Sequence, residues 1–286
     1  MPNVVFAGEP MIRMSCTLGI LVLMVLWEVL APRRSQEIGR WQRWPSNLGI
    51  VVVDTALVRV VFPAAAVGMA MLAQRRGWGL FNVLPVLGWA VPGWAAVPAS
   101  VILLDLVIYA QHRVFHAVPW LWRLHRMHHA DLEIDVTTGV RFHPIEIGLS
   151  LGIKIAAVIV LGAPPIGVLI FEVLLNATSM FNHGNVRLPG PIDRVLRRMV
   201  VTPEMHRVHH SILRYETDSN FGFNLPWWDH LFGTYRAQPE AGHERMTIGI
   251  DRFRDSGELR LDRMLFQPLR NDGPAPRSTG PEARPA

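Results

Sequence analysis

The sequence predicts an all-α membrane protein in which four or five transmembrane helices carry a helical cap on the cytosolic side. Apolar residues make up 50% of the 286-residue chain, and its mean hydropathy is +0.23. Long apolar runs follow one another up to about residue 182, whereas the remainder carries most of the charge. This division predicts a lipid-embedded part and a water-exposed part in one chain.

The first two spans are expected at residues 11–30 and 48–73. The first run has about the 20 residues that a helix needs to cross a bilayer. A signal peptide is the alternative, but no small-x-small cleavage site follows the run, and two arginines come directly after it. In the second run Asp54 and Arg59 would be costly in lipid, so we expect them to face protein or to snorkel.

The later spans are interrupted by proline. Residues 80–110 contain three prolines, which predict a bent or re-entrant lead-in followed by a helix from about residue 94. Residues 145–163 and 165–182 are two apolar runs joined at Pro164 and Pro165. Their length and proximity predict a helical hairpin.

Arginine distribution predicts the orientation. The loop at residues 31–47 carries four arginines and the loop at 74–79 carries two, so the positive-inside rule places the first loop in the cytoplasm. Following the chain from there brings the end of the third span, the end of the hairpin and the C-terminal third to the same side. Every histidine cluster falls on that side.

The net charge of +5 comes almost wholly from arginine, since Lys154 is the only lysine. The arginines flank apolar segments, which favours membrane-surface anchoring and argues against nucleic-acid binding. Cys16 is the only cysteine, which excludes an intramolecular disulfide and a site built on several thiolates. Histidine must therefore provide any metal ligands.

Eleven of the twelve histidines lie between residues 112 and 230, and eight of them form three tight groups. Residues three and four apart share a helix face, so HxxxH and HxxHH each present imidazoles together. The groups are HRVFH (His112, His116), HRMHH (His125, His128, His129) and HRVHH (His206, His209, His210).

Eight ligands are too many for one tetrahedral zinc ion, so two metal ions are the natural number. Imidazole suits iron, zinc, copper and nickel alike, which leaves the identity open at this point. The sequence lacks the two ExxH motifs of carboxylate-bridged di-iron bundles and the HExxH motif of zinc proteases.

Four further histidines are weighed singly. His183 in FNHGN follows an apolar helix, and Gly184 could end that helix, so we expect a ninth ligand there. His143 precedes Pro144 and could be either a ligand or a helix N-terminal residue. His230 could be a ligand or a partner of the neighbouring Asp229, and His243 is expected in a solvated loop.

Three polar residues are candidates to orient the imidazoles through their second ring nitrogen. Asp105 lies two helical turns before His112, and Glu172 and Asn176 share a helix face that runs towards His183. The alternative for the last two is a polar contact between membrane helices.

Together these motifs resemble the fatty acid hydroxylase and sterol desaturase superfamily of membrane oxygenases. The match runs over about residues 100–236 through HRVFH, HRMHH, NHGN and TPEMHRVHHS, then NFGFNLPWWDHLFGTY. The last stretch is similar to the bacterial sterol desaturase-like branch and, more distantly, to alkylglycerol monooxygenases.

The resemblance implies transmembrane helices capped by a cytosolic helical domain, with two metal ions between them. The ligand set it implies is His112, His116, His125, His128, His129, His183, His206, His209 and His210. We divide the chain into N-terminal transmembrane helices (1–99), a catalytic domain (100–236) with a helical hairpin (145–182), a cytosolic segment (237–270) and a disordered tail (271–286).

The implied activity is hydroxylation, or desaturation, of a C–H bond in a lipid drawn from the bilayer. It implies two iron ions (zinc being possible in isolated protein), dioxygen, and electrons from a separate donor, since no dinucleotide-binding or haem motif is present. The expected location is a bacterial inner membrane, with the metal site and the C-terminus in the cytoplasm.

Three rivals make different predictions. A histidine-rich membrane protein that binds or transports metal without redox catalysis would place its ligands near the midplane of broken helices. A non-catalytic scaffold would keep the metals only as a structural clamp, which needs fewer ligands. A bis-histidine haem protein would have isolated histidines on facing helices.

Overall fold

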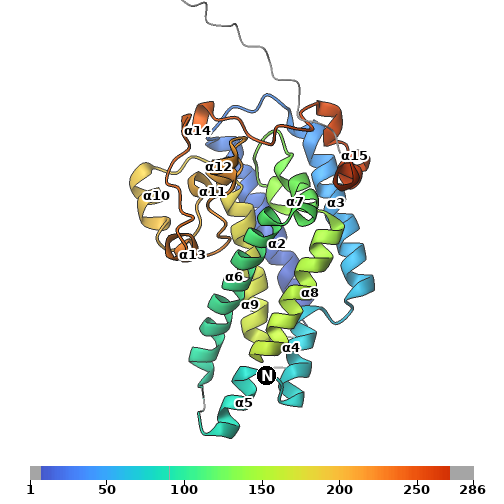
Figure 1. The fold of residues 1–286 in the computed structure, drawn as a ribbon, viewed down its shortest axis with the longest axis vertical. Helices are drawn as coiled ribbons and strands as arrows, with labels where there is room; N and C mark the ends of the chain where they lie inside the picture. The colour runs from blue at the N-terminus through green and yellow to red at the C-terminus, as the bar shows by residue number, and fades with distance from the viewer. Residues whose placement is uncertain (1–7, 90, 271–286) are drawn as a thin grey trace, which may run out of the picture.

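The computed structural model describes residues 8–89 and 91–270, which form a helical bundle with a cap at one end (Figure 1). Within these residues the only β-pairings are isolated bridges, so the all-α prediction is confirmed. The expected disordered tail at 271–286 lies outside the described residues.

Five helical segments are long and apolar enough to span a membrane, which confirms the upper of the two expected numbers. The first and third are α2 (Glu9–Leu30) and α6 (Gly93–Ala117). The hairpin consists of α8 (Pro144–Leu161) and α9 (Pro165–Asn182). Short helices α5 (Leu80–Val83) and η1 (Leu84–Leu87) form the bent lead-in to α6.

The second span differs from the continuous run expected at 48–73. Helix α3 begins at Arg40 and ends at Val61, and α4 (Ala65–Arg76) continues the segment. Pro63 explains the break, since it disfavours helical backbone at Phe62, whose φ and ψ are −128° and 63°. Asp54 faces protein as expected, with 7% of its surface exposed.

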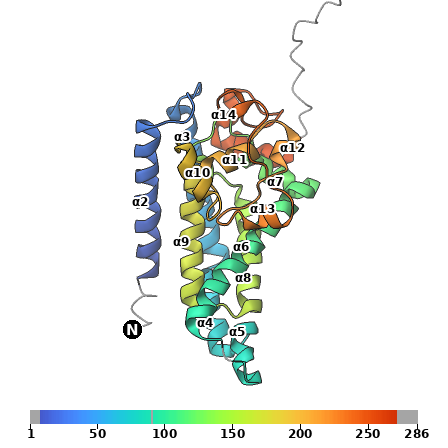
Figure 2. The same cartoon turned by 90° about the vertical axis from the view of Figure 1, so that its left-hand side faces the viewer.

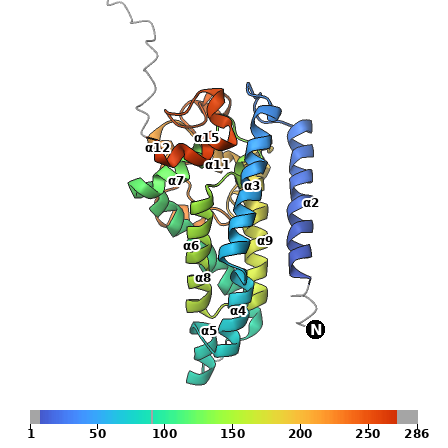
Figure 3. The same cartoon turned by 90° about the vertical axis from the view of Figure 1, so that its right-hand side faces the viewer.

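The bundle core lies where α4, α6, α8 and α9 meet. One residue from each helix illustrates it: Ala70, Leu104, Val158 and Phe171 are at most 1% exposed. Helix α2 lies at the edge of the bundle and packs against α9. It is on the opposite side of the bundle from α6 and α8 (Figures 2 and 3). The bundle therefore gives the cap a rigid base.

The cap is built from α7, from the loop that follows it, and from the chain after α9. Its helices are α7 (Pro119–His129), η2 (Thr138–Val140), α10 (Gly190–Leu196), α11 (Pro203–His209), α12 (Arg214–Thr217), α13 (Trp227–Leu231), α14 (Gly242–Arg245), η3 (Ser256–Leu259), α15 (Leu261–Phe266) and η4 (Gln267–Leu269). All lie at the end of the bundle where α2, α6 and α9 finish (Figure 1).

Arginines of the α2–α3 connection and of the first turn of α3 hold the cap rather than only flanking the membrane. Arg33 bonds Glu204 at 2.7 Å, and Arg34 donates to the Met246 carbonyl at 2.8 Å. Buried Arg43 forms a bidentate pair with Asp131 at 2.8 and 2.7 Å. The interpretation of these arginines as membrane-surface anchors was therefore incomplete, because the sequence does not show their partners in the cap.

Candidate metal centre

Nine histidines converge where the bundle meets the cap. Helix α6 supplies two from its last turns, α7 and the α11 region supply three each, and His183 caps the C-terminal end of α9. All nine side chains are buried, with at most 4% exposure. Gly139 permits the close approach of α9, because a Cβ there would lie 2.5 Å from the Ser179 carbonyl oxygen and 3.2 Å from the His183 ring.

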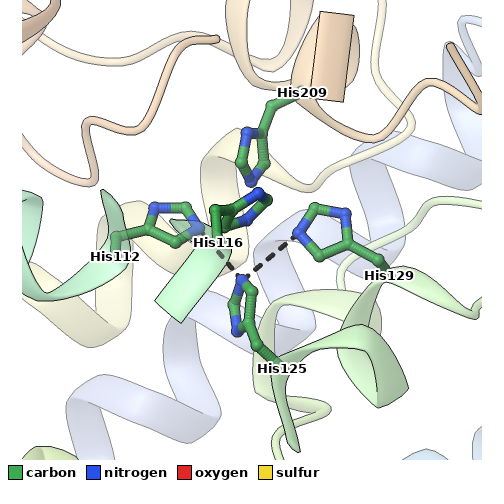
Figure 4. A group of neighbouring side chains, drawn as sticks. All are labelled: His112, His116, His125, His129 and His209. Atoms are coloured by element: carbon green, nitrogen blue, oxygen red, sulfur yellow. Dashed lines mark hydrogen bonds between the residues drawn. The ribbon is translucent and has the colours of Figure 1, made fainter. Parts of the chain in front are cut away.

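The nine rings form two adjoining groups, in each of which one nitrogen per ring lies within 4.8 Å of the others. The five-histidine group consists of His112, His116, His125, His129 and His209 (Figure 4). The four-histidine group consists of His128, His183, His206 and His210. The rings of His129 and His210 stack at 4.6 Å between centroids, so the groups are direct neighbours.

Each HxxHH triplet contributes to both groups. In α7, His125 and His129 are four residues apart and enter the five-histidine group, while His128 points to the other. In α11 the relation is reversed, since His206 and His210 enter the four-histidine group. Residues four apart lie on one helix face, and the third histidine is offset to reach the neighbouring group.

Hydrogen bonds at Nδ1 turn the Nε2 atoms of most rings inward. Each partner is a carbonyl or carboxylate oxygen, so Nδ1 carries the proton and Nε2 presents a lone pair. In the five-histidine group the bonds are His112 to Phe221 O (2.8 Å), His116 to Asp218 (3.2 Å), His125 to Glu146 (2.6 Å) and His209 to Ser219 O (2.7 Å). In the four-histidine group they are His128 to Arg141 O (3.1 Å) and His183 to Ser179 O (2.7 Å).

The inward lone pairs lie too close together to be stable without a cation. Nε2 of His112 is 3.1 Å from Nε2 of His125, and Nε2 of His128 is 3.1 Å from Nε2 of His183. Neither member of these pairs has a proton to share at that position. Two nitrogens bound to one ion at about 2.0–2.1 Å would lie roughly 2.9–3.4 Å apart, which fits the observed spacing.

The imidazoles are held in the neutral form that metals bind. Burial lowers the pKa of His183 to about 4 and that of His209 to about 3. Burial, with repulsion from neighbouring imidazoles, also holds the pKa of four further cap histidines well below the usual value; these are His128, His129, His206 and His210. The donor set therefore fits one divalent ion in each group.

The weaker histidine candidates lie outside both groups. His143 is the N-cap of α8, where its Nδ1 accepts from the Ile145 amide at 3.2 Å. His230 is exposed and stacks on Tyr235, while Asp229 instead accepts the amides of Phe221 and Gly222. His243 was wrongly expected in solvent, because it is 5% exposed and contacts Glu204 at 2.8 Å.

The polar candidates hold other parts of the structure. Asp105 accepts from the amides of Asn224 and Leu225 and from the Trp228 indole. It therefore fixes the segment that directly follows the two residues whose carbonyls accept from His112 and His209. Glu172 pairs with Lys154 at 2.6 Å and with Arg13, and Asn176 bonds Thr17 at 3.1 Å. The contacts of Glu172 and Asn176 are therefore polar contacts between membrane helices, which was the alternative to a role beside the histidines.

Two carboxylates that orient histidines were not among the residues predicted from the sequence. Glu146 lies in the first turn of α8, next to the His143–Pro144 pair, and Asp218 follows α12. The sequence offered one signal for Glu146, since it is the only acidic residue in the apolar run 145–163. Phe142, which stacks on His128 at 4.5 Å, had no comparable signal.

Comparisons with known proteins match the region that contains this site. The fatty acid hydroxylase family model matches residues 97–234. An ornithine lipid hydroxylase from Rhizobium tropici is 31% identical over 50% of this chain and 42% of its own length. An alkylglycerol monooxygenase from Caenorhabditis elegans is 26% identical over 70% of this chain and 38% of its own length.

A cholesterol 25-hydroxylase from Rattus norvegicus is 28% identical over 55% of this chain and 51% of its own length. The chain thus spans about half, or less, of the length of these relatives. No solved structure matches. The matched region contains all nine converging histidines, two complete membrane helices (α8 and α9) and most of a third (α6). Residues 97–234 of this integral membrane protein belong to the fatty acid hydroxylase and sterol desaturase superfamily.

Proposed function

We propose that this protein is a di-iron oxygenase that hydroxylates a C–H bond of a membrane lipid, using dioxygen and electrons from a separate donor protein. The observation that carries the proposal is the pair of adjoining histidine groups, with nine buried imidazoles. The names of the relatives favour hydroxylation over desaturation.

A bound pair of iron ions would provide the redox chemistry that reduces dioxygen and oxidises the C–H bond. The chain would hold those ions through the nine histidines and keep water away from them. Phe142 stacks on His128, and Phe223 lies 5.2 Å from the His112 ring and 6.0 Å from the His206 ring. Phe223 also belongs to the bundle core, so the membrane side of the centre is apolar.

The orientation of the site is part of the proposal. The histidines lie at the same end of the bundle as the α2–α3 connection, whose arginines favour the cytoplasm. A cytoplasmic site at the membrane surface could receive electrons from a soluble or peripheral donor and a lipid from the inner leaflet of a bacterial membrane. The position at the ends of the membrane helices argues against a metal transporter, whose sites lie near the midplane.

Labelled oxygen tests the function directly. The iron-loaded full chain, reduced chemically in membranes of its native host, is exposed to ¹⁸O₂, and the lipids are analysed by mass spectrometry. We expect one labelled oxygen atom per modified lipid, lost in His128→Ala and His209→Ala and kept in His230→Ala, which changes an exposed histidine outside both groups. Metal binding without labelled lipid under these conditions would favour the transport or scaffold alternatives.

A further inference from the structure

An apolar groove of about 400 Å³ lies on the outer face of the bundle between α6, α7 and α8. In Figure 1 these three helices lie on the face towards the viewer, with α7 above the other two. The groove is lined by Val107, Ala110, Gln111, Val114, Phe115, Trp120, Leu121, Leu149 and Ile153. Gln111 is the only polar residue of this lining, so the groove suits a hydrocarbon rather than a charged ligand.

The groove opens to the lipid but reaches into the protein. Val114 and Ile153 at its rim are 48% and 41% exposed, on helices that span the membrane. Phe115 and Leu121 at its depth are only 2% and 8% exposed. Lipid chains moving over the outer surface of the bundle would touch the rim, and only a chain seated in the groove would touch the depth.

The depth of the groove adjoins the five-histidine group. The Phe115 ring lies 6.1 Å from the His125 ring, and Phe115 is next to His116 in α6. On α8, Leu149 follows Glu146 by three residues, and Glu146 bonds His125. One phenyl ring therefore separates the groove from the candidate metal ligands.

Length and position fit a lipid chain that extends from the membrane surface. Val107 and Val114 are seven residues apart on α6, which corresponds to about 10 Å along the helix. Trp120 is 61% exposed at the cap end of the groove. Tryptophan at such a position is typical of the level of the lipid headgroups.

We propose that this groove binds the hydrocarbon chain of the lipid substrate, with the headgroup near Trp120 and Phe115 as the wall between the chain and the histidines. The identification of the bound lipid as the substrate rests on the proposed function. The occupant is a membrane lipid because the lining is apolar and the groove faces the bilayer. Movement of the Phe115 side chain would bring the chain to the His125 side.

Photolabelling tests the occupant without any need for catalysis. The full chain is reconstituted in phosphatidylcholine vesicles that contain a phosphatidylcholine with a diazirine in its acyl chain, and the labelled residues are identified by mass spectrometry. We expect label on Phe115 and Leu121. Ile153→Trp fills the groove from α8, and Val114→Trp fills it from α6, so each should lower that label about tenfold.

Val160→Trp is the matched control, because Val160 is 71% exposed on α8 but does not line the groove. It should leave the label on Phe115 and Leu121 unchanged. Label confined to rim residues, or equal label at depth in all three variants, would overturn the groove as a lipid site. Metal content, unchanged in each variant, shows that the fold is intact.

The labelled-oxygen assay separates this proposal from the function on which it rests. Label at depth with no oxidised lipid would support the groove and overturn the oxygenase proposal. Oxidised lipid with no label at depth would support the oxygenase and overturn the groove. Both results positive, with slower oxidation in Ile153→Trp and Val114→Trp than in Val160→Trp, would support the full proposal.

Discussion

The two histidine groups use the same residue type, but they differ in the groups that accept hydrogen bonds from their imidazoles. Two rings of the five-histidine group donate to carboxylates, Glu146 and Asp218. In the four-histidine group, the partners of His128 and His183 are backbone carbonyls. A carboxylate makes the imidazole more basic and adds negative charge near a bound cation. We therefore expect the five-histidine group to hold its metal more tightly.

The four-histidine group depends instead on a buried arginine network. The carbonyl that orients His128 belongs to Arg141, whose side chain donates to Asn47 at 3.0 Å and lies beside Asp131. Burial alone would raise the pKa of Asp131, but the guanidinium charges of Arg43 and Arg141, with hydrogen bonds from Arg43 and Thr138, outweigh it and hold that pKa well below the usual value. This group is thus tied to α3 through neutralised buried charges.

Removal of one ligand from each group gives the largest expected effect. His125→Ala should lose the ion of the five-histidine group and keep the other, and His128→Ala should do the converse. Each would reduce the metal from about two ions per chain to about one, with loss of lipid oxidation. Metal content and activity of the two variants check this. Loss of all metal from either variant would show that the groups are not independent.

Arg43→Gln should be the most damaging change to stability. It removes the guanidinium that bridges Asp131 and Asp135, both buried at 0% exposure, and breaking such a buried pair costs about 3–5 kcal/mol. The measurement is the free energy of unfolding in mixed micelles, with Arg76→Gln as an exposed control. Equal stability of the two variants would contradict the role of this network.

Glu146→Gln sharpens the contrast between the groups. The amide preserves the size of the side chain but removes its charge, so the metal affinity of the five-histidine group should fall about 10- to 100-fold. Competition with a chelator measures both sites in one titration. The four-histidine group should be unchanged, and a parallel loss from both groups would refute the separate roles assigned to their outer partners.

Asp218→Asn should have the smallest effect. The Asp218 side chain is 36% exposed and also pairs with Arg214, so solvent screens its charge. We expect a change in metal affinity of roughly two- to threefold. The same chelator titration checks it. A loss as large as that of Glu146→Gln would mean that burial does not determine the strength of these contacts.

Much of the fold and of the donor set follows from local sequence. Apolar run length predicted the membrane helices, and i, i+4 spacing predicted that His112 and His116 act together. The division of each triplet between two groups could not be predicted, because it depends on how α7 and α11 pack. The carbonyl partners at Ser219 and Phe221 also carry no sequence signal, since any residue provides a carbonyl.

The central claim is that nine histidines hold two metal ions. The most direct test is metal content by mass spectrometry on full-length protein purified anaerobically, without a chelator or a polyhistidine tag. The two groups predict about two ions per chain, and the proposed function predicts that they are iron, with oxygen uptake on reduction. One ion per chain, or none, would contradict the account.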